Sequence, residues 1–120
     1  MANTASLAIN LSANIASATV GMGTVSMAPT LTGADYVQSS QTVGTSAEAI
    51  GKGDIGTAGI LCFWNQDAAN PVNLGYDDAV AVPVATIKAG EVCCFRPTSA
   101  TLYGKATGGN VICAYVWLED

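Results

Sequence analysis

The sequence predicts an all-β protein: a single β-sandwich or jelly-roll-like domain of about eight strands with an extended N-terminal arm. Turn-forming residues recur roughly every 8–12 residues, which is the spacing of sandwich and barrel folds. The apolar runs between the turns alternate with period two or are apolar on both faces, and no window shows a helical stripe. The chain has 120 residues, which fits one domain. An immunoglobulin-like topology is the alternative arrangement of such strands.

Residues 1–34 are expected to form the extended arm with the first strands, and residues 35–120 the sandwich. The arm has no charged side chain before Asp35. Residues 7–11 alternate between apolar and small polar side chains, as a half-buried strand does. Because alanine and small polar residues supply little core, we expect this arm to become ordered against another surface.

The expected strands of the sandwich are separated by turns rich in Gly, Pro, Asn and Asp. Residues 60–64 (ILCFW) are apolar on both faces, which predicts a central strand. Residues 72–74 are expected to pair back on them as a hairpin, and the turn at 107–110 to close the last hairpin. Pro83 indicates an edge strand or a bulge. The expected strands are residues 36–46, 47–50, 60–64, 72–74, 80–85, 92–96, 101–106 and 111–118.

The composition excludes some classes of function. The formal net charge is −5, and 11% of the residues are charged. The only cations, Lys52, Lys88, Arg96 and Lys105, are scattered and form no patch for phosphates, so we expect no nucleic-acid partner. So few charges indicate that neighbouring subunits cover part of the surface.

The first residues show neither a signal peptide nor a membrane span. A signal peptide needs a positively charged start and an apolar run, and this segment has neither. Asn and Ser interrupt it too often for a span. We therefore expect no membrane partner and folding in the cytoplasm.

No residue is predicted to be catalytic, to bind a cofactor or to ligate a metal. The chain has no histidine, which excludes Ser-His-Asp and Cys-His catalysis. Asp77-Asp78 is interpreted as a solvated turn rather than a calcium site, and Gly51-Lys52-Gly53 lacks the spacing of a phosphate loop. We expect no enzyme, and a small hydrolase acting through carboxylates is the least favoured alternative. Almost all the carboxylates lie in expected turns or at the end: Asp35, Glu48, Asp54, Asp67, Asp77, Asp78, Glu91, Glu119 and Asp120.

The cysteines and the large aromatic residues are interpreted mainly as core. Vicinal Cys93 and Cys94 point to opposite faces of a strand, which argues against a four-thiolate metal site. The cysteines are therefore expected to fill core positions as small hydrophobic side chains, with a disulfide between neighbouring strands as the alternative. The two tryptophans are likewise expected in the core rather than on a sugar-binding platform, and two tyrosines are assigned to a subunit interface. These residues are Cys62, Cys93, Cys94 and Cys113, then Trp64 and Trp117, then Tyr103 and Tyr115.

Residues 42–118 resemble a class of small virion proteins of tailed bacteriophages, of the decoration or minor structural kind. The resemblance depends on an ordered run of turn and strand motifs. These are TVGTSAEAI (42–50), GILCFWNQD (59–67), NPVNLGYDD (70–78), IKAGEVCCFRP (87–97), TLYGKA (101–106) and VICAYVWLED (111–120). The uncharged first third departs from the pattern, and no functional residue is carried over.

This resemblance implies a virion structural (cement) protein on the outer capsid surface, made in the host cytoplasm. Its partners would be the major capsid protein and further copies of itself, a homo-oligomer for which a trimer fits a threefold lattice position. It would bind between major capsid subunits and stabilise the shell. The alternatives are a tail, neck or fibre-associated virion protein and a carbohydrate- or receptor-binding β-sandwich.

Overall fold

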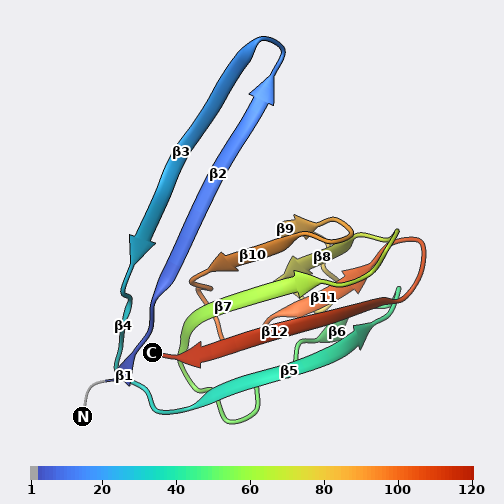
Figure 1. Cartoon of the computed structure of the whole chain (residues 1–120). Helices are drawn as coiled ribbons and strands as arrows, with labels where there is room; N and C mark the ends of the chain where they lie inside the picture. Colours follow the sequence, from blue (N-terminus) through green and yellow to red (C-terminus); the bar gives the residue numbers. More distant parts are fainter. Residues whose placement is uncertain (1–2) are drawn as a thin grey trace. The chain divides into compact units, whose positions relative to one another are not determined.

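The computed structural model describes residues 3–120 of the chain, and these form strands and turns without a helix. The chain divides into two compact units, Met1–Thr32 and Gly33–Asp120. The strands of the first unit are β1 (Asn3–Thr4), β2 (Leu7–Ile15), β3 (Ala18–Met27) and β4 (Thr30–Leu31) (Figure 1). Those of the second are β5 (Tyr36–Val43), β6 (Glu48–Ala49), β7 (Ala58–Asn65), β8 (Val72–Gly75), β9 (Pro83–Ile87), β10 (Val92–Phe95), β11 (Tyr103–Ala106) and β12 (Val111–Glu119).

The first unit, where the sequence predicted an extended arm with the first strands, is a β-hairpin. β2 and β3 pair antiparallel along their whole length. β1 pairs with β4 at the open end of the hairpin, opposite the turn (Figure 1). The connection is a tight turn at Ala16 and Ser17, which lets Ile15 pair with Ala18. The sequence indicated the first strand correctly. The second also alternates, but its apolar pattern shifts by one residue at the bulge near Gly23, and it was not recognised as the partner of the first.

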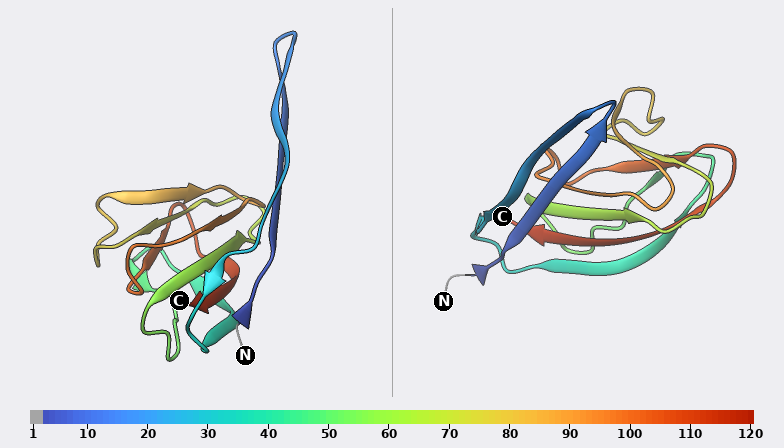
Figure 2. Two further views of the ribbon diagram at one scale, coloured as in Figure 1. Left: turned by 90° about the vertical axis from the view of Figure 1, so that its left-hand side faces the viewer. Right: turned by 45° about the horizontal axis from the view of Figure 1, so that its top comes forward.

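The second unit is a sandwich of two four-stranded antiparallel sheets. One, the β12 sheet, has the order β10-β7-β12-β5, and the other, the β11 sheet, has the order β6-β11-β8-β9. Most consecutive strands alternate between the sheets, and the first strand of the unit pairs with the last. This strand order is that of a jelly roll. The two layers are visible from two sides in Figures 1 and 2. The predicted all-β sandwich of jelly-roll type is therefore confirmed.

The core lies between the two sheets. β12 alternates strictly between buried and more exposed side chains from Val111 to Trp117, as a strand with one covered face does. The rings of Phe63 and Tyr115 stack with centroids 6.2 Å apart. The buried members of the core are Val43, Ile50, Ile55, Leu61, Phe63, Val72, Leu74, Ile87, Leu102, Ala106, Val111, Cys113, Tyr115 and Trp117.

Two expected hairpins are wrong. β8 pairs with β9 and β11 instead of β7, and the turn after β11 leads into the other sheet. A turn that crosses between layers contains the same Gly, Pro and Asn residues as a hairpin turn, so composition does not separate the two cases. The expected strand at 80–85 also starts later, at Pro83, because Val80 has a φ of 51° and lies in the preceding turn.

The side chain of Asn65 holds the loop in which the chain crosses from β7 to the β11 sheet. It is the one buried polar residue among the residues described, with no exposed surface. Its Nδ2 donates to the carbonyl oxygens of Asn70 at 2.9 Å and Ile87 at 3.0 Å, and its Oδ1 accepts from the amide of Asp67 at 2.9 Å. A buried amide with its groups bonded in this way stabilises one loop conformation, whereas an unbonded one would be costly.

Candidate interaction surfaces

The β2–β3 hairpin has one apolar and one polar face. Residues directly opposite each other on paired strands share a face, and alternate residues along a strand do too. One face therefore carries the pairs Leu7–Met27, Ile9–Val25, Leu11–Gly23, Ala13–Val20 and Ile15–Ala18, which together we name the hairpin apolar face. The opposite face carries Ala8–Ser26, Asn10–Thr24, Ser12–Gly21 and Asn14–Thr19.

The register of the hairpin keeps this separation along its whole length. Met22 is an extra residue in a bulge beside Leu11, and the next residue, Gly23, has a φ of 65°. Glycine adopts this left-handed conformation without the penalty of a Cβ atom. On the polar face, Thr19 Oγ1 donates to Asn14 Oδ1 at 2.9 Å.

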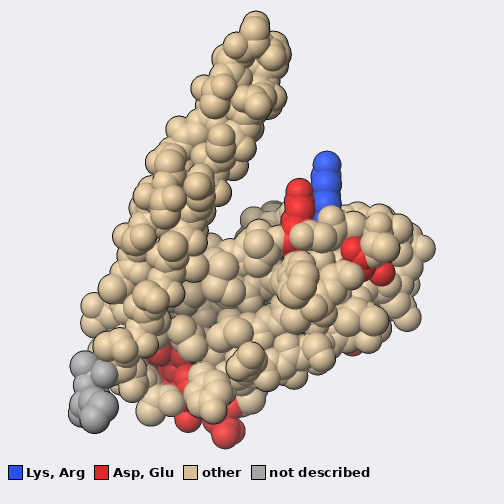
Figure 3. Space-filling model, in the orientation of Figure 1, with Lys and Arg blue, Asp and Glu red and all other residues tan. Residues whose placement is uncertain are grey.

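The hairpin apolar face is exposed. Ile9 has 43% of its surface exposed, Leu11 59% and Ile15 62%, and Val20, Val25 and Met27 are also exposed. No side chain in residues 1–34 is charged, and the hairpin in Figure 3 accordingly shows no acidic or basic atom. A two-stranded hairpin alone is at best marginally stable in water, so this face needs a covering surface.

The β12 sheet has a second surface of this kind on the side away from the core. In its four strands, all of which the structure describes, the only charged residue is Glu119 at the end of β12. We name this side the sheet outer face. It consists of Tyr36, Gln38, Ser40, Thr42, Ile60, Cys62, Trp64, Val92, Cys94, Ile112, Ala114, Val116 and Leu118, of which Ile60 is buried.

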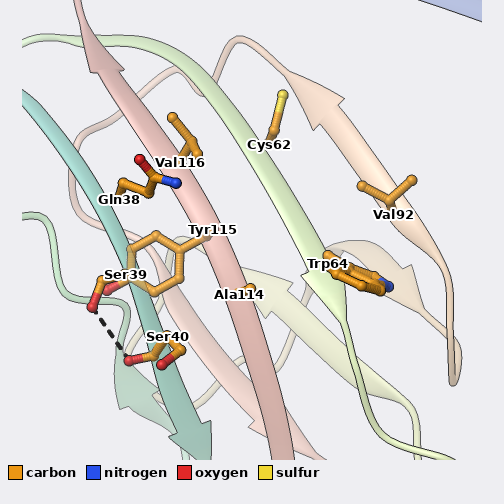
Figure 4. Close-up of a pocket in the computed structure, with 9 residues that line it drawn as sticks. All are labelled: Gln38, Ser39, Ser40, Cys62, Trp64, Val92, Ala114, Tyr115 and Val116. Carbon is orange, nitrogen blue, oxygen red and sulfur yellow. Dashed lines mark hydrogen bonds between the residues drawn. The ribbon is translucent and has the colours of Figure 1, made fainter.

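A shallow hollow of about 430 Å³ lies on the sheet outer face. One row across the sheet places Trp64 between Val92 on β10 and Ala114 on β12, with Ser40 beyond Ala114 (Figure 4). Because the side chains of Ala114 and Ser40 are small, the surface of the sheet beside the large indole of Trp64 is recessed. Trp64 has 47% of its surface exposed.

The prediction that both tryptophans lie in the core is therefore wrong for Trp64. Trp117 is fully buried, as expected, although its Nε1 has no hydrogen-bond partner among the residues described. The assignment of Tyr115 to a subunit interface is also wrong, because this residue lies in the core, whereas Tyr103 is half-buried on β11.

A disulfide joins Cys62 and Cys94 on the sheet outer face. The two residues are direct partners on β7 and β10, with Cα atoms 4.1 Å apart. The expectation of four unpaired cysteines is wrong for this pair, and the alternative of a cross-strand disulfide is correct. As expected, Cys93 points to the opposite face and packs against the core.

The two free cysteines are small hydrophobic residues. Burial raises the pKa of the Cys93 thiol, and burial followed by the charge of Asp67 raises the pKa of the Cys113 thiol to about 12. A thiol with so high a pKa is not a nucleophile at neutral pH.

The carboxylates that the sequence placed in turns bind local backbone. Asp77 accepts from the amides of Ala79 and Ala81 at 3.1 and 2.8 Å, and these bonds lower its pKa, the bond from Ala81 contributing most. Asp67 accepts from the amides of Ala69 and Asn70, and the bond from Asn70 is the main cause of its lowered pKa. The carboxylates in these turns, which were expected to be solvated, are thus held in place by hydrogen bonds from the backbone amides of their own loops.

Glu119 connects two segments at one end of the sandwich. Its Oε1 accepts from the amide of Gly56 at 2.9 Å, and its Oε2 accepts from the amides of Ala34 and Asp35 at 3.3 Å. The backbone bond from Gly56 is the main cause of its lowered pKa. This role is structural, and no motif in the sequence indicated it.

No chemical site emerges from the residues that the structure describes. Among them, no group of three or more His, Cys, Asp or Glu residues is placed to hold a metal ion. Residues 3–120 also contain no helix with the length and apolar character to cross a membrane. Comparison of the chain with protein-family models, curated proteins and solved structures finds no match.

Proposed function

We propose that this protein is a non-enzymatic virion structural protein that decorates a tailed-phage capsid, binding on its outer surface between major capsid subunits and stabilising the shell. The observation that carries the proposal is the exposed, uncharged hairpin apolar face. Exposed apolar patches of this kind mark protein interaction sites. The resemblance of residues 42–118 to small phage virion proteins is the reason for proposing a phage capsid as the assembly to which the protein binds.

The jelly-roll order of the sandwich supports this proposal by analogy alone. Viral capsid domains use this fold, but so do lectins and cupins, and a fold does not determine a function. The surface chemistry supports it more directly. Both the hairpin apolar face and the sheet outer face lack charges, so covering them desolvates no ion. Contacts that are individually weak become strong when a lattice repeats them.

Purified particles of the phage that encodes this chain provide the test. Quantitative mass spectrometry should find the protein in a copy number that matches the capsid lattice. A copy number matching the tail or neck would instead support a tail, neck or fibre-associated protein. Deletion of residues 2–28 should leave a folded sandwich that no longer attaches to particles lacking the native protein. Wild-type occupancy by the truncated protein would contradict the proposed role of the hairpin.

Trp64 favours a second candidate function, a carbohydrate-binding β-sandwich. An exposed indole in a hollow can stack on the apolar face of a sugar ring, and Gln38 and Ser40 supply hydrogen-bonding groups beside it. Glycan-array binding that is lost in Trp64→Ala and retained in the control Ile112→Ala, an exposed residue of the same face, would support this function. Absence of binding in the wild type would exclude it for the glycans on the array.

A further inference from the structure

We infer that the hairpin apolar face packs onto the sheet outer face of a second copy of this chain, so that neighbouring copies exchange hairpins. This inference rests on the proposed function and adds that the hairpin acts there by linking neighbouring copies, whose combined contacts hold the protein on the capsid. The two surfaces account for most of the large hydrophobic residues exposed in the described chain. Ile9, Leu11, Ile15, Val20, Val25 and Met27 lie on the hairpin apolar face, and Tyr36, Trp64, Val92 and Ile112 lie on the sheet outer face.

The two surfaces match in size. β2 and β12 each contain nine residues, which at about 3.4 Å per residue gives strands roughly 30 Å long. Sheets pack face to face about 10 Å apart through interdigitated side chains. The small side chains of Ala114 and Ser40 leave space for a protruding side chain such as Leu11.

The two surfaces also match in charge. Copies of a chain with a net charge of −5 repel one another. Neither surface contains any of these charges, because the hairpin has none and the strands of the β12 sheet have only Glu119 at one end. Contact between these two surfaces therefore keeps the acidic groups of both copies in solvent.

The area is sufficient when the exchange is reciprocal. A ribbon roughly 30 Å long and 10 Å wide covers about 300 Å², so one hairpin-to-sheet contact buries about 600 Å² over both surfaces. A pair of copies that each donate one hairpin buries about 1,200 Å², the lower end of the range for stable interfaces. A closed ring of more copies gives each chain the same two contacts.

The first experiment measures the mass of the full-length protein in solution without particles, by sedimentation equilibrium over a range of concentrations. We expect a closed oligomer. Leu11→Asp should weaken association about 100-fold or more, since it buries an unpaired charge. The matched control Ser12→Asp places the same charge on the polar face of the same strand and should have little effect. Leu11→Asn repeats the test without a charge.

The sheet outer face is tested with Ser40→Asp, which introduces a charge in the hollow. This variant should dissociate to a similar degree. Its control, Thr86→Asp, introduces the same charge on the outside of the β11 sheet, where Thr86 Oγ1 donates to Asn73 Oδ1, and should remain associated. Near-ultraviolet circular dichroism should show that every variant keeps the packed core.

Mixing the two dissociated variants identifies the contact. Leu11→Asp keeps an intact sheet outer face and Ser40→Asp an intact hairpin, so one of the two contacts can form between them. The mixture should therefore give a 1:1 heteromer, weaker than the wild-type oligomer, at concentrations where each variant alone is monomeric, and native mass spectrometry resolves it by mass. Wild-type monomers at every concentration would overturn the inference, as would oligomers that survive either substitution. Absence of the heteromer at every concentration would overturn the hairpin-to-sheet contact. An oligomer that Leu11→Asp dissociates and Ser40→Asp leaves intact would also overturn it and would indicate packing between hairpins. These outcomes involve no capsid, so they are independent of the particle-binding test of the proposed function.

Discussion

Trp64 lies directly opposite Ala114 on the neighbouring strand, whereas Trp117 lies opposite Leu61 on the same two strands but faces the core. The two tryptophans of the chain thus occupy opposite sides of one sheet. One contributes to a surface and the other to the stability of the sandwich.

This difference gives the first prediction. Trp117→Ala should lower the free energy of unfolding by about 3–5 kcal/mol, because it removes a fully buried aromatic side chain. Trp64→Ala should lower it by about 1 kcal/mol or less, as expected for a half-exposed side chain. Urea denaturation of monomeric protein, followed by far-ultraviolet circular dichroism, measures both. Equal losses would contradict the assignment of the two faces.

A second prediction concerns Asn65. Asn65→Ala should destabilise the sandwich by about 2–4 kcal/mol, because it removes three hydrogen bonds and leaves the carbonyl of Ile87 without its donor. Asn110→Ala changes the same residue type at an exposed turn position and is the control. Urea denaturation again measures both losses. If the two variants have the same stability, Asn65 does not fix the loop.

A third prediction concerns pH. Backbone hydrogen bonds lower the pKa of Glu119 below 4.5 and those of Asp67 and Asp77 below 3.8. A carboxylate whose pKa is lower in the folded state stabilises the protein above its unfolded pKa, and this stabilisation is lost as the pH falls through the folded value. Stability should therefore hold from pH 7 to about pH 5 and then fall.

The contribution of Glu119 to this pH dependence can be isolated. Glu119→Gln should be less stable than the wild type at pH 7 and should lose less stability between pH 5 and pH 2. Asp54→Asn, at an exposed turn carboxylate, is the control and should keep the wild-type profile. Urea midpoints at each pH give the comparison, and a Glu119→Gln profile parallel to that of the wild type would refute the assignment.

A fourth prediction concerns the disulfide. Cys62 and Cys94 are separated by 32 residues in sequence, and a cross-link closing a loop of that size stabilises by roughly 3–4 kcal/mol in the chain-entropy model. Reduction should lower the urea midpoint of the wild type accordingly. The double variant Cys62→Ala/Cys94→Ala should not respond to the reductant, whereas Cys93→Ala should respond as the wild type does. A wild-type midpoint unchanged by reduction would count against the bond.

A fifth prediction concerns the hairpin turn. Ala16 has a φ of 55°, in the left-handed region where a Cβ atom costs about 1 kcal/mol. Ala16→Gly removes that cost and should slow hydrogen exchange of the β2 and β3 amides by up to about fivefold. Ser17→Gly, at the next position of the turn, should not slow it, because glycine there only adds freedom to the unfolded chain.

The sequence predicted the class of fold well because that depends on local signals. β12 alternates cleanly, and most of the strands fall close to where the turns placed them. The pairing of β5 with β12 was not predictable in the same way, since it joins Tyr36 to Leu118 across the whole domain. Such pairings depend on the packing of complete sheets rather than on any local pattern.

The candidate surfaces were predictable only in part. The absence of charge before Asp35 was visible in the sequence and indicated a segment that needs a partner. The orientation of Trp64 was hidden, because the run ILCFW is apolar on both faces. Asn65 contained the missing signal: as a buried residue it shares its side with Leu61 and Phe63, which leaves Trp64 outside. A single polar residue next to an apolar run did not suffice to assign that side.

The position of β12 has a consequence for synthesis. This strand follows β5 and β7 in the chain but lies between them, so the sheet has a gap in its middle until residues 111–119 have been synthesised. A chain that stops before these residues would retain the hairpin but could not complete the sheet that we propose as its receptor. Only molecules that contain β12 would then both donate a hairpin and accept one, so assembly would discriminate against shorter products without a separate proofreading factor.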